Sequence, residues 1–213
     1  MMTGAGPAKA IIMFLALALA ACSDDTRIAP NYEMEFVDVL TDASGTGSTL
    51  VTDRGEHLSV TNPFTALKAD TAYRYVAYLI RQGNGVEVAA ASRAICDTPK
   101  DMSGEDIKTD SVKMQSIWRG SHYINLTLMI PHRDQQHEFA FIDRGISQAD
   151  DGHKTLCIRL YHDAGNDFPA FSATCYLSCS LKPYKDLLRE GRDSVCFVIN
   201  EYKKGQATYR LPY

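Results

Sequence analysis

Short apolar runs with a period of two constrain this fold more than any other feature of the chain. The clearest run is YINLTLMI at residues 123–130, in which Ile124, Leu126, Leu128 and Ile130 alternate with other side chains. Successive side chains of a β-strand point to opposite faces, so this spacing predicts a strand with one apolar face. Beyond residue 108 the sequence predicts seven strands, at residues 110–116, 123–130, 137–143, 155–162, 171–181, 194–200 and 207–212. Seven short strands at this density are typical of an antiparallel β-sandwich, which we assign to residues 109–213.

The first half of the chain also predicts strands, at residues 33–41, 48–53, 56–61, 71–81 and 85–95. Hairpin-type turns separate several of them, as in SGTG at residues 44–47 and GNG at residues 83–85. Because closure protects strand edges, five short strands favour an OB-like barrel over residues 33–96. The polar segment 97–108 contains proline and glycine and is interpreted as a linker. The predicted fold class is therefore all-β, with one short helix at residues 184–191.

An apolar run near the start of the chain indicates export. Residues 11–21 are all apolar, follow one basic residue, Lys9, and end in small side chains. The run is shorter than the ~20 residues of a membrane span and is typical of a signal peptide over residues 1–21. Its last residues, LAAC at 19–22, resemble a lipobox, so we predict that Cys22 carries diacylglycerol, whose two acyl chains make a stable membrane tether. Residues 22–32 are interpreted as the tether, and the alternative is ordinary secretory cleavage without lipidation.

Two acidic residues directly follow the predicted anchor. Ser23, Asp24 and Asp25 resemble the surface-export signal of lipoproteins in Bacteroidota. This resemblance implies a lipid-anchored protein of the outer membrane, exposed at the cell surface. The alternatives are that the acids form a solvated tether and that the protein faces the periplasm.

The cysteine count limits disulfide bonding. The chain beyond Cys22 holds five cysteines, which cannot all pair within one chain: Cys96, Cys157, Cys175, Cys179 and Cys196. Cys175 and Cys179 lie four residues apart in one predicted strand, about 13 Å from each other, which is beyond disulfide reach. They share a predicted face with Leu177 and Leu181, so we expect them to serve as small apolar core residues.

Four segments carry a resemblance to a known family. They are LVTDRGEHLSV at 50–60, WRGSHYINLTLMI at 118–130, LYHDAGNDFPAF at 160–171 and VCFVINEY at 195–202. Together they resemble the NigD-like lipoproteins of Bacteroidota. The resemblance implies a lipoprotein leader, an N-terminal OB-like domain and a C-terminal β-sandwich. The family is named after a gene beside a bacteriocin gene, which implies immunity by association and assigns no catalytic residue.

Two polar groups suggest metal binding, but neither has the spacing of a known metal motif. In YHDAGND at residues 161–167, Asp163, Asn166 and Asp167 offer oxygen ligands, yet the EF-hand spacing fails and a side-chain-bonded turn explains the same residues. His132 and His137 lie five residues apart across a predicted loop, and no HExxH motif includes them. We therefore expect neither a metal nor another cofactor.

Catalysis is not expected either. The sequence has no GxSxG nucleophile elbow, and its cysteines lie in apolar runs that would not stabilise a thiolate. Nucleic acid is disfavoured as a partner, because residues 31–98 hold five basic and nine acidic side chains, a net charge of −4.

Aromatic and polar side chains supply candidate binding residues for a glycan or a protein. Trp118 and Tyr123 flank a polar turn, the polar loop adds His162, Asp163, Asn166 and Asp167, and the strand at 71–81 offers Tyr73, Tyr75 and Tyr78. The alternative for the aromatic residues is core packing. We expect a non-catalytic surface binding module for a glycan or protein. The alternatives are an immunity protein against a bacteriocin or toxin, and a structural part of an envelope assembly.

Overall fold

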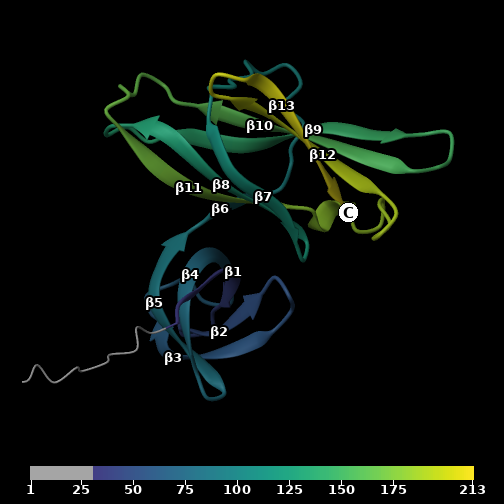
Figure 1. Ribbon diagram of the computed structural model, residues 1–213. Helices are drawn as coiled ribbons and strands as arrows, with labels where there is room; N and C mark the ends of the chain where they lie inside the picture. Colours follow the sequence, from purple (N-terminus) through teal and green to yellow (C-terminus); the bar gives the residue numbers. More distant parts are fainter. Residues whose placement is uncertain (1–30) are drawn as a thin grey trace, which may run out of the picture. The chain divides into compact units, whose positions relative to one another are not determined.

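β-Strands build the core in the computed structural model, which describes residues 31–213. They form a closed barrel and two four-stranded sheets (Figure 1), so the predicted all-β fold class is confirmed. The predicted signal peptide, lipidation site Cys22 and export residues Ser23, Asp24 and Asp25 lie outside the described residues. Among residues 31–213, no helix has the length and apolarity needed to cross a membrane.

The barrel contains the five strands expected in the first half of the chain. They are β1 (Glu33–Leu40), β2 (Gly47–Thr52), β3 (His57–Phe64), β4 (Ala72–Gln82) and β5 (Gly85–Arg93). The strands pair in the order β1-β2-β3-β5-β4, and β4 pairs with β1 to close the barrel. Alternate side chains such as Val37, Val39, Leu50 and Leu79 are fully buried inside it. The opposite face of β1 and β4 therefore remains available for contacts outside the barrel.

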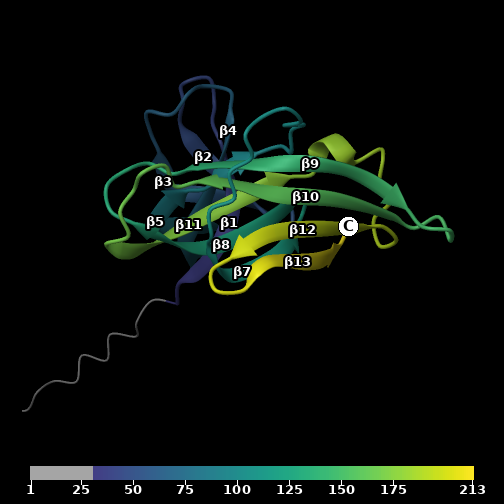
Figure 2. The same ribbon diagram turned by 90° about the horizontal axis from the view of Figure 1, so that it is seen from above.

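Two sheets form the sandwich. One has the order β13-β12-β10-β9 and the other the order β6-β11-β8-β7; Figure 2 shows the strands of the first sheet side by side. Apolar side chains from both sheets, including Leu126, Leu128, Leu156 and Phe197, form one core. All seven predicted strands of the sandwich are present: β7 (Lys113–Gly120), β8 (Tyr123–His132), β9 (Glu138–Gln148), β10 (Lys154–Asp163), β11 (Phe171–Ser180), β12 (Ser194–Glu201) and β13 (Gly205–Pro212).

An eighth strand, β6 (Ile95–Asp97), extends the predicted seven-stranded sandwich. The sequence places Ile95 at the end of the last barrel strand, but the chain leaves the barrel at Ala94. There β6 pairs in parallel with β11, with Ile95 opposite Leu177. Alternation shows that a segment is extended but does not show which sheet accepts it.

The predicted helix at residues 184–191 is wrong. The chain forms a three-residue 3-10 helix, η1 (Lys182–Tyr184), followed by hydrogen-bonded turns. Tyr184 and Leu188 are buried in the sandwich core, which accounts for the helix-like spacing of apolar residues. Packing against the core thus holds this segment as turns.

The cysteines of β11 lie where the alternation places them. Cys179 is fully buried and Cys175 packs against the sandwich core, and the five cysteines of the described chain are all free. The prediction that Cys175 and Cys179 act as small apolar residues is therefore confirmed.

The segment interpreted as a linker runs along the sandwich. Lys100 forms a parallel bridge with Ile142, and Thr109 forms one with His162. These bridges attach both ends of the polar segment to β9 and β10 of the first sheet.

Candidate functional site

A buried arginine joins the barrel to the sandwich. Arg74 lies on β4, on the face that points away from the barrel interior, and its side chain is 2% exposed. Asp38 is its cross-strand partner on β1 and lies 3.3 Å from the guanidinium, while Asp53 lies 2.5 Å from it. Two carboxylates thus balance one buried cation, as a charge removed from water requires.

The sandwich contributes polar partners to the same guanidinium. Arg74 donates hydrogen bonds to Ser178 Oγ at 3.1 Å and to Asn125 Oδ1 at 3.2 Å. Ser178 and Asn125 are neighbours in the β11–β8 ladder, and Ser178 also donates to Asn125 Oδ1 at 2.7 Å. The ring of Tyr123 lies 4.0 Å from the centre of the guanidinium. This connected network fixes the junction, because each group orients its neighbours.

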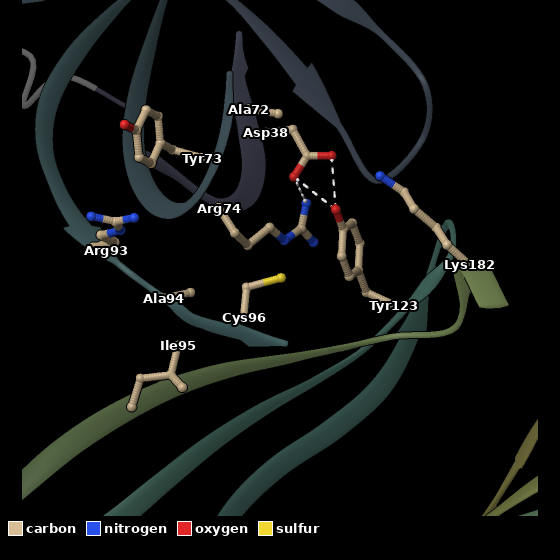
Figure 3. Close-up of a pocket in the computed structure, with 10 residues that line it drawn as sticks. All are labelled: Asp38, Ala72, Tyr73, Arg74, Arg93, Ala94, Ile95, Cys96, Tyr123 and Lys182. Carbon is tan, nitrogen blue, oxygen red and sulfur yellow. Dashed lines mark hydrogen bonds and ion pairs between the residues drawn. The ribbon is translucent and has the colours of Figure 1, made fainter. Parts of the chain in front are cut away.

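A pocket of about 450 Å³ opens beside this network (Figure 3). Its lining comes from β1, β4, β5, β6, β8 and η1, so both the barrel and the sandwich contribute. The residues that line it are Asp38, Ala72, Tyr73, Arg74, Arg93, Ala94, Ile95, Cys96, Tyr123 and Lys182. We call it the junction pocket, since neither the barrel nor the sandwich lines it alone.

The charge of the junction pocket is predominantly positive. Arg74, Arg93 and Lys182 supply cations and Asp38 is the single acid of the lining. Asp38 and Asp53 already neutralise Arg74, whereas among residues 31–213 no ion pair involves Arg93 or Lys182. Both side chains lie over aromatic rings, Arg93 at 4.6 Å from the Tyr73 ring centre and Lys182 at 5.7 Å from that of Tyr123. The pocket therefore offers two cations to an anionic group.

The pocket also contains a thiol. Cys96 is exposed as a residue, but its sulfur points into the pocket (Figure 3). Burial there raises the pKa of this thiol to about 11. The sulfur is therefore protonated at neutral pH and is a poor nucleophile.

Of the two aromatic candidates beside the polar turn, only Tyr123 lines the junction pocket. Its hydroxyl donates to Asp38, and burial, followed by the nearby Asp38 charge, raises its pKa. Trp118 packs edge-on against Phe36 of the barrel, with ring centres 5.1 Å apart. Of the other tyrosines considered, Tyr73 lines the pocket, whereas Tyr75 packs against the barrel core and Tyr78 is exposed.

The polar-loop candidates lie elsewhere, at one end of the sandwich. His162 is buried and bonds to His137, and the Asp167 carboxylate accepts from three backbone N–H groups. Asp163 accepts from the N–H of Gly165, which is the side-chain-bonded turn considered from the sequence, and Asn166 is exposed. The structure therefore divides the candidate binding residues between two places.

Arg74, Arg93 and Lys182 are not among the candidate residues predicted from the sequence. Arg74 stands between two tyrosines in a strand with an otherwise apolar face, which is a detectable signal of a buried charge. Arg93 and Lys182 are exposed and lie 89 positions apart, so nothing in their local sequence indicates one pocket.

Comparisons with known proteins agree with this architecture. Residues 94–213 match the family described as NigD-like C-terminal beta sandwich domain. A NigD-like immunity protein from Bacteroides caccae is 25% identical, with a TM-score of 0.68 over 85% of this chain and 92% of that one. A putative toxin related protein from Parabacteroides distasonis is 17% identical, with a TM-score of 0.62 over 86% and 93% of the two chains. A putative lipoprotein from Bacteroides fragilis is 15% identical, with a TM-score of 0.59 over 86% and 98%. A search of curated proteins finds no match.

Proposed function

Because this chain belongs to the NigD-like family, we propose that it is a lipid-anchored envelope protein that binds an acidic segment of a protein partner and has no catalytic activity. The LAAC sequence ending at Cys22 supports the anchor, as does the similarity to a chain described as a lipoprotein. The acids at positions 24 and 25 support display at the outer face of the outer membrane. A protein held at a membrane surface by lipid is well placed to meet partners outside the cell.

The observation that carries the binding function is the pair of free cations in the junction pocket. Arg93 lies on a barrel strand and Lys182 follows a sandwich strand, and the Arg74 network joins the barrel to the sandwich. An acidic segment that lies across the pocket would meet Arg93 on one side and Lys182 on the other (Figure 3), without first displacing an internal acid. Charge complementarity of this kind supplies specificity and accelerates association.

The aromatic rings of the site favour a protein over a glycan. Sugars stack on open ring faces, but cations lie over Tyr73 and Tyr123, and Trp118 packs against Phe36. Acidic side chains need no such platform. We therefore place glutamate or aspartate side chains of a partner in the pocket.

The chemistry of the pocket supports a role without catalysis. The Cys96 thiol has a raised pKa, and Arg74 is committed to Asp38 and Asp53. A nucleophile would need a base or a nearby cation to activate it, and here burial dominates over the Arg74 charge at the sulfur.

Binding is tested with the full-length chain in detergent. The probes are a glutamate-rich peptide, the same peptide with glutamine in place of glutamate, and an oligogalacturonate as an acidic glycan. We expect only the glutamate peptide to bind, with an affinity that falls as salt concentration rises. The double variant Arg93→Glu and Lys182→Glu is expected to weaken binding by on the order of tenfold or more.

A matched control separates the pocket from general surface charge. Lys185→Glu reverses an exposed cation three positions from Lys182 that does not line the pocket, and it should leave peptide affinity unchanged. Equal loss in the control, or no binding of the glutamate peptide, would refute the proposed pocket. If only oligogalacturonate bound, the partner would be an acidic glycan and not a protein.

Immunity is the second candidate, and the similarity to a chain described as a NigD-like immunity protein favours it. In that case the acidic segment belongs to a bacteriocin or toxin that the anchored protein captures. Cells lacking this protein should then be more sensitive to a producer strain, and the wild-type gene should restore resistance where the Arg93→Glu, Lys182→Glu variant does not. Unchanged sensitivity after deletion would remove this candidate.

A further inference from the structure

Two histidines and an aspartate converge at the end of the sandwich, away from the junction pocket. His132 ends β8, His137 precedes β9, and Asp167 lies in the loop between β10 and β11. His132 Nδ1 lies 3.0 Å and His137 Nε2 lies 3.1 Å from the same oxygen, Asp167 Oδ2. The side chains of His137 and Asp167 are 2% and 1% exposed, whereas that of His132 is 29% exposed. One oxygen thus faces two imidazole nitrogens in a site that is open to solvent on one side.

A chain of hydrogen bonds fixes the tautomers of the two buried rings. The backbone carbonyl of Asp110 can only accept, so His162 Nδ1, at 2.9 Å from it, carries a proton. In the neutral form of this ring, a proton on Nδ1 leaves Nε2 as an acceptor. His137 Nδ1 lies 2.9 Å from that Nε2 and must therefore donate to it. The Phe139 ring stacks on the His162 ring, with ring centres 4.5 Å apart, and holds the imidazole in this orientation.

With these tautomers, the unprotonated Nε2 of His137 faces the Asp167 carboxylate. When its Nδ1 carries the proton, a neutral His137 presents the lone pair of Nε2 to a carboxylate oxygen. The Asp167 carboxylate accepts hydrogen bonds from the backbone N–H groups of Arg133, Asp134 and Gln135, an arrangement that suits a negatively charged acceptor. A lone pair and a carboxylate repel each other at 3.1 Å, so a positive charge is required between them.

His132, the third residue of the cluster, also lacks a group between its Nδ1 and the Asp167 carboxylate. His132 Nδ1 is buried and has no hydrogen-bond partner of suitable geometry among the described residues, although Asp167 Oδ2 lies 3.0 Å away. A single proton on His137 would satisfy only one of the two rings. A metal ion bound by all three groups would satisfy both.

We propose that His132 Nδ1, His137 Nε2 and Asp167 Oδ2 bind a divalent transition metal, with Zn²⁺ the preferred ion. The three ligand atoms lie within 4.8 Å of one another, and tetrahedral zinc with ligands at ~2.1 Å places its ligand atoms about 3.4 Å apart. Imidazole and carboxylate are ligands that suit zinc, and solvent completes the coordination at the open side.

The surroundings match those of metal sites. His137 donates its second ring N–H to His162, and backbone N–H groups of residues 133–135 orient the Asp167 carboxylate. Such outer hydrogen bonds orient metal ligands and tune their affinity. Sequence spacing does not join these ligands into one site, because Asp167 lies 30 positions beyond His137 and no local motif contains all three.

Zn²⁺ binding to the full-length chain tests the proposal. Equilibrium dialysis should show one tightly bound Zn²⁺ at this site, and Zn²⁺ should raise the melting temperature. His132→Ala, a change at a partly exposed residue, should lower the affinity by on the order of tenfold or more. His57→Ala removes an exposed histidine of β3 and should bind Zn²⁺ like the wild type.

Two further measurements separate loss of this site from misfolding and from metal binding by cysteines. The melting temperature of His132→Ala in a chelator reports whether the variant is folded, and Asp167→Asn provides a second ligand change. Co²⁺ binding distinguishes ligand types, because cysteine thiolates give an intense near-ultraviolet charge-transfer band and imidazole and carboxylate do not. A thiolate band, or Zn²⁺ affinity that both ligand variants leave unchanged, would overturn the site. The proposed site would also be overturned if the wild type bound no Zn²⁺. A proton would then lie between the histidines and Asp167.

Discussion

Replacing Arg74 by methionine should strongly destabilise the protein. Methionine preserves much of the side-chain volume but removes the charge that balances Asp38 and Asp53. It also removes the donors to Ser178 and Asn125, which lie on the sandwich. The variant therefore leaves two carboxylates at the junction without their cation.

The size of the effect follows from burial. Breaking a fully buried ion pair costs about 3–5 kcal/mol, and the side chains of Asp38 and Asp53 are 15% and 18% exposed, so solvent reduces that cost somewhat. We expect a loss of about 3 kcal/mol in the free energy of unfolding. For a protein of this size that corresponds to a fall of roughly 6–12 °C in melting temperature.

Urea unfolding of the full-length chain in detergent measures the effect, with Arg81→Met as the matched control. Arg81 lies on the same strand and also pairs with two carboxylates, Glu33 and Glu56, but its side chain is 40% exposed. Exposed pairs contribute about 0–1 kcal/mol, so the control should lose little. Adding Asp38→Asn and Asp53→Asn to the Arg74 variant should recover part of the stability, because the unpaired charges are removed. If Arg74→Met costs no more than Arg81→Met, the reasoning from burial is refuted.

Three further predictions follow from local geometry. Gly120→Ala should cost about 1–3 kcal/mol in urea unfolding, because a Cβ would collide with the Asp53 carboxylate, and a stability equal to wild type would contradict this. Cys157 and Cys196 lie on paired parallel strands with sulfurs 3.7 Å apart, so oxidised glutathione should join them in a disulfide, visible by non-reducing peptide mass spectrometry. Absence of that peptide would show that the strands hold the sulfurs apart. Backbone hydrogen bonds lower the pKa of Asp193 to about 2, so its stabilisation is present above pH ~4 and lost as the pH falls towards 2. The stability gap between wild type and Asp193→Asn should therefore narrow over this range, and a gap that does not change with pH would contradict the assignment.

Much of the fold could be predicted because the strands follow a strict physical period. Tyr123–His132 alternates between two faces, and turns with glycine mark where neighbouring strands end. Residues 184–191 misled the prediction because two buried residues four positions apart, Tyr184 and Leu188, pack into a sandwich core from turns as readily as from a helix. The spacing of apolar residues indicates which side chains are buried, but it does not determine the backbone conformation of the segment.

The candidate sites were harder to predict because their residues are brought together by long-range pairing. Arg74 meets Ser178 across 104 positions, and His132 meets Asp167 across 35. In the sequence His132 stands near His137, whereas Asp167 belongs to the polar loop at residues 161–167, so one cluster resembles two unrelated features. Only the ladder between β8 and β11, which sets the loop beside the end of β8, unites them.

The three residues of β6 also cover part of one side of β11. β11 pairs with β8 on one side, and on its other side Ile95–Asp97 pairs with Leu177–Cys179. A sandwich cut from the chain after these residues would expose a row of unpaired backbone groups on β11, which is a template for a strand from another molecule. Two copies with a loosened connection at Ala94 could exchange β6 and become an intertwined dimer. The short strand that follows the barrel thus reduces the length of β11 that is open to a strand from another molecule.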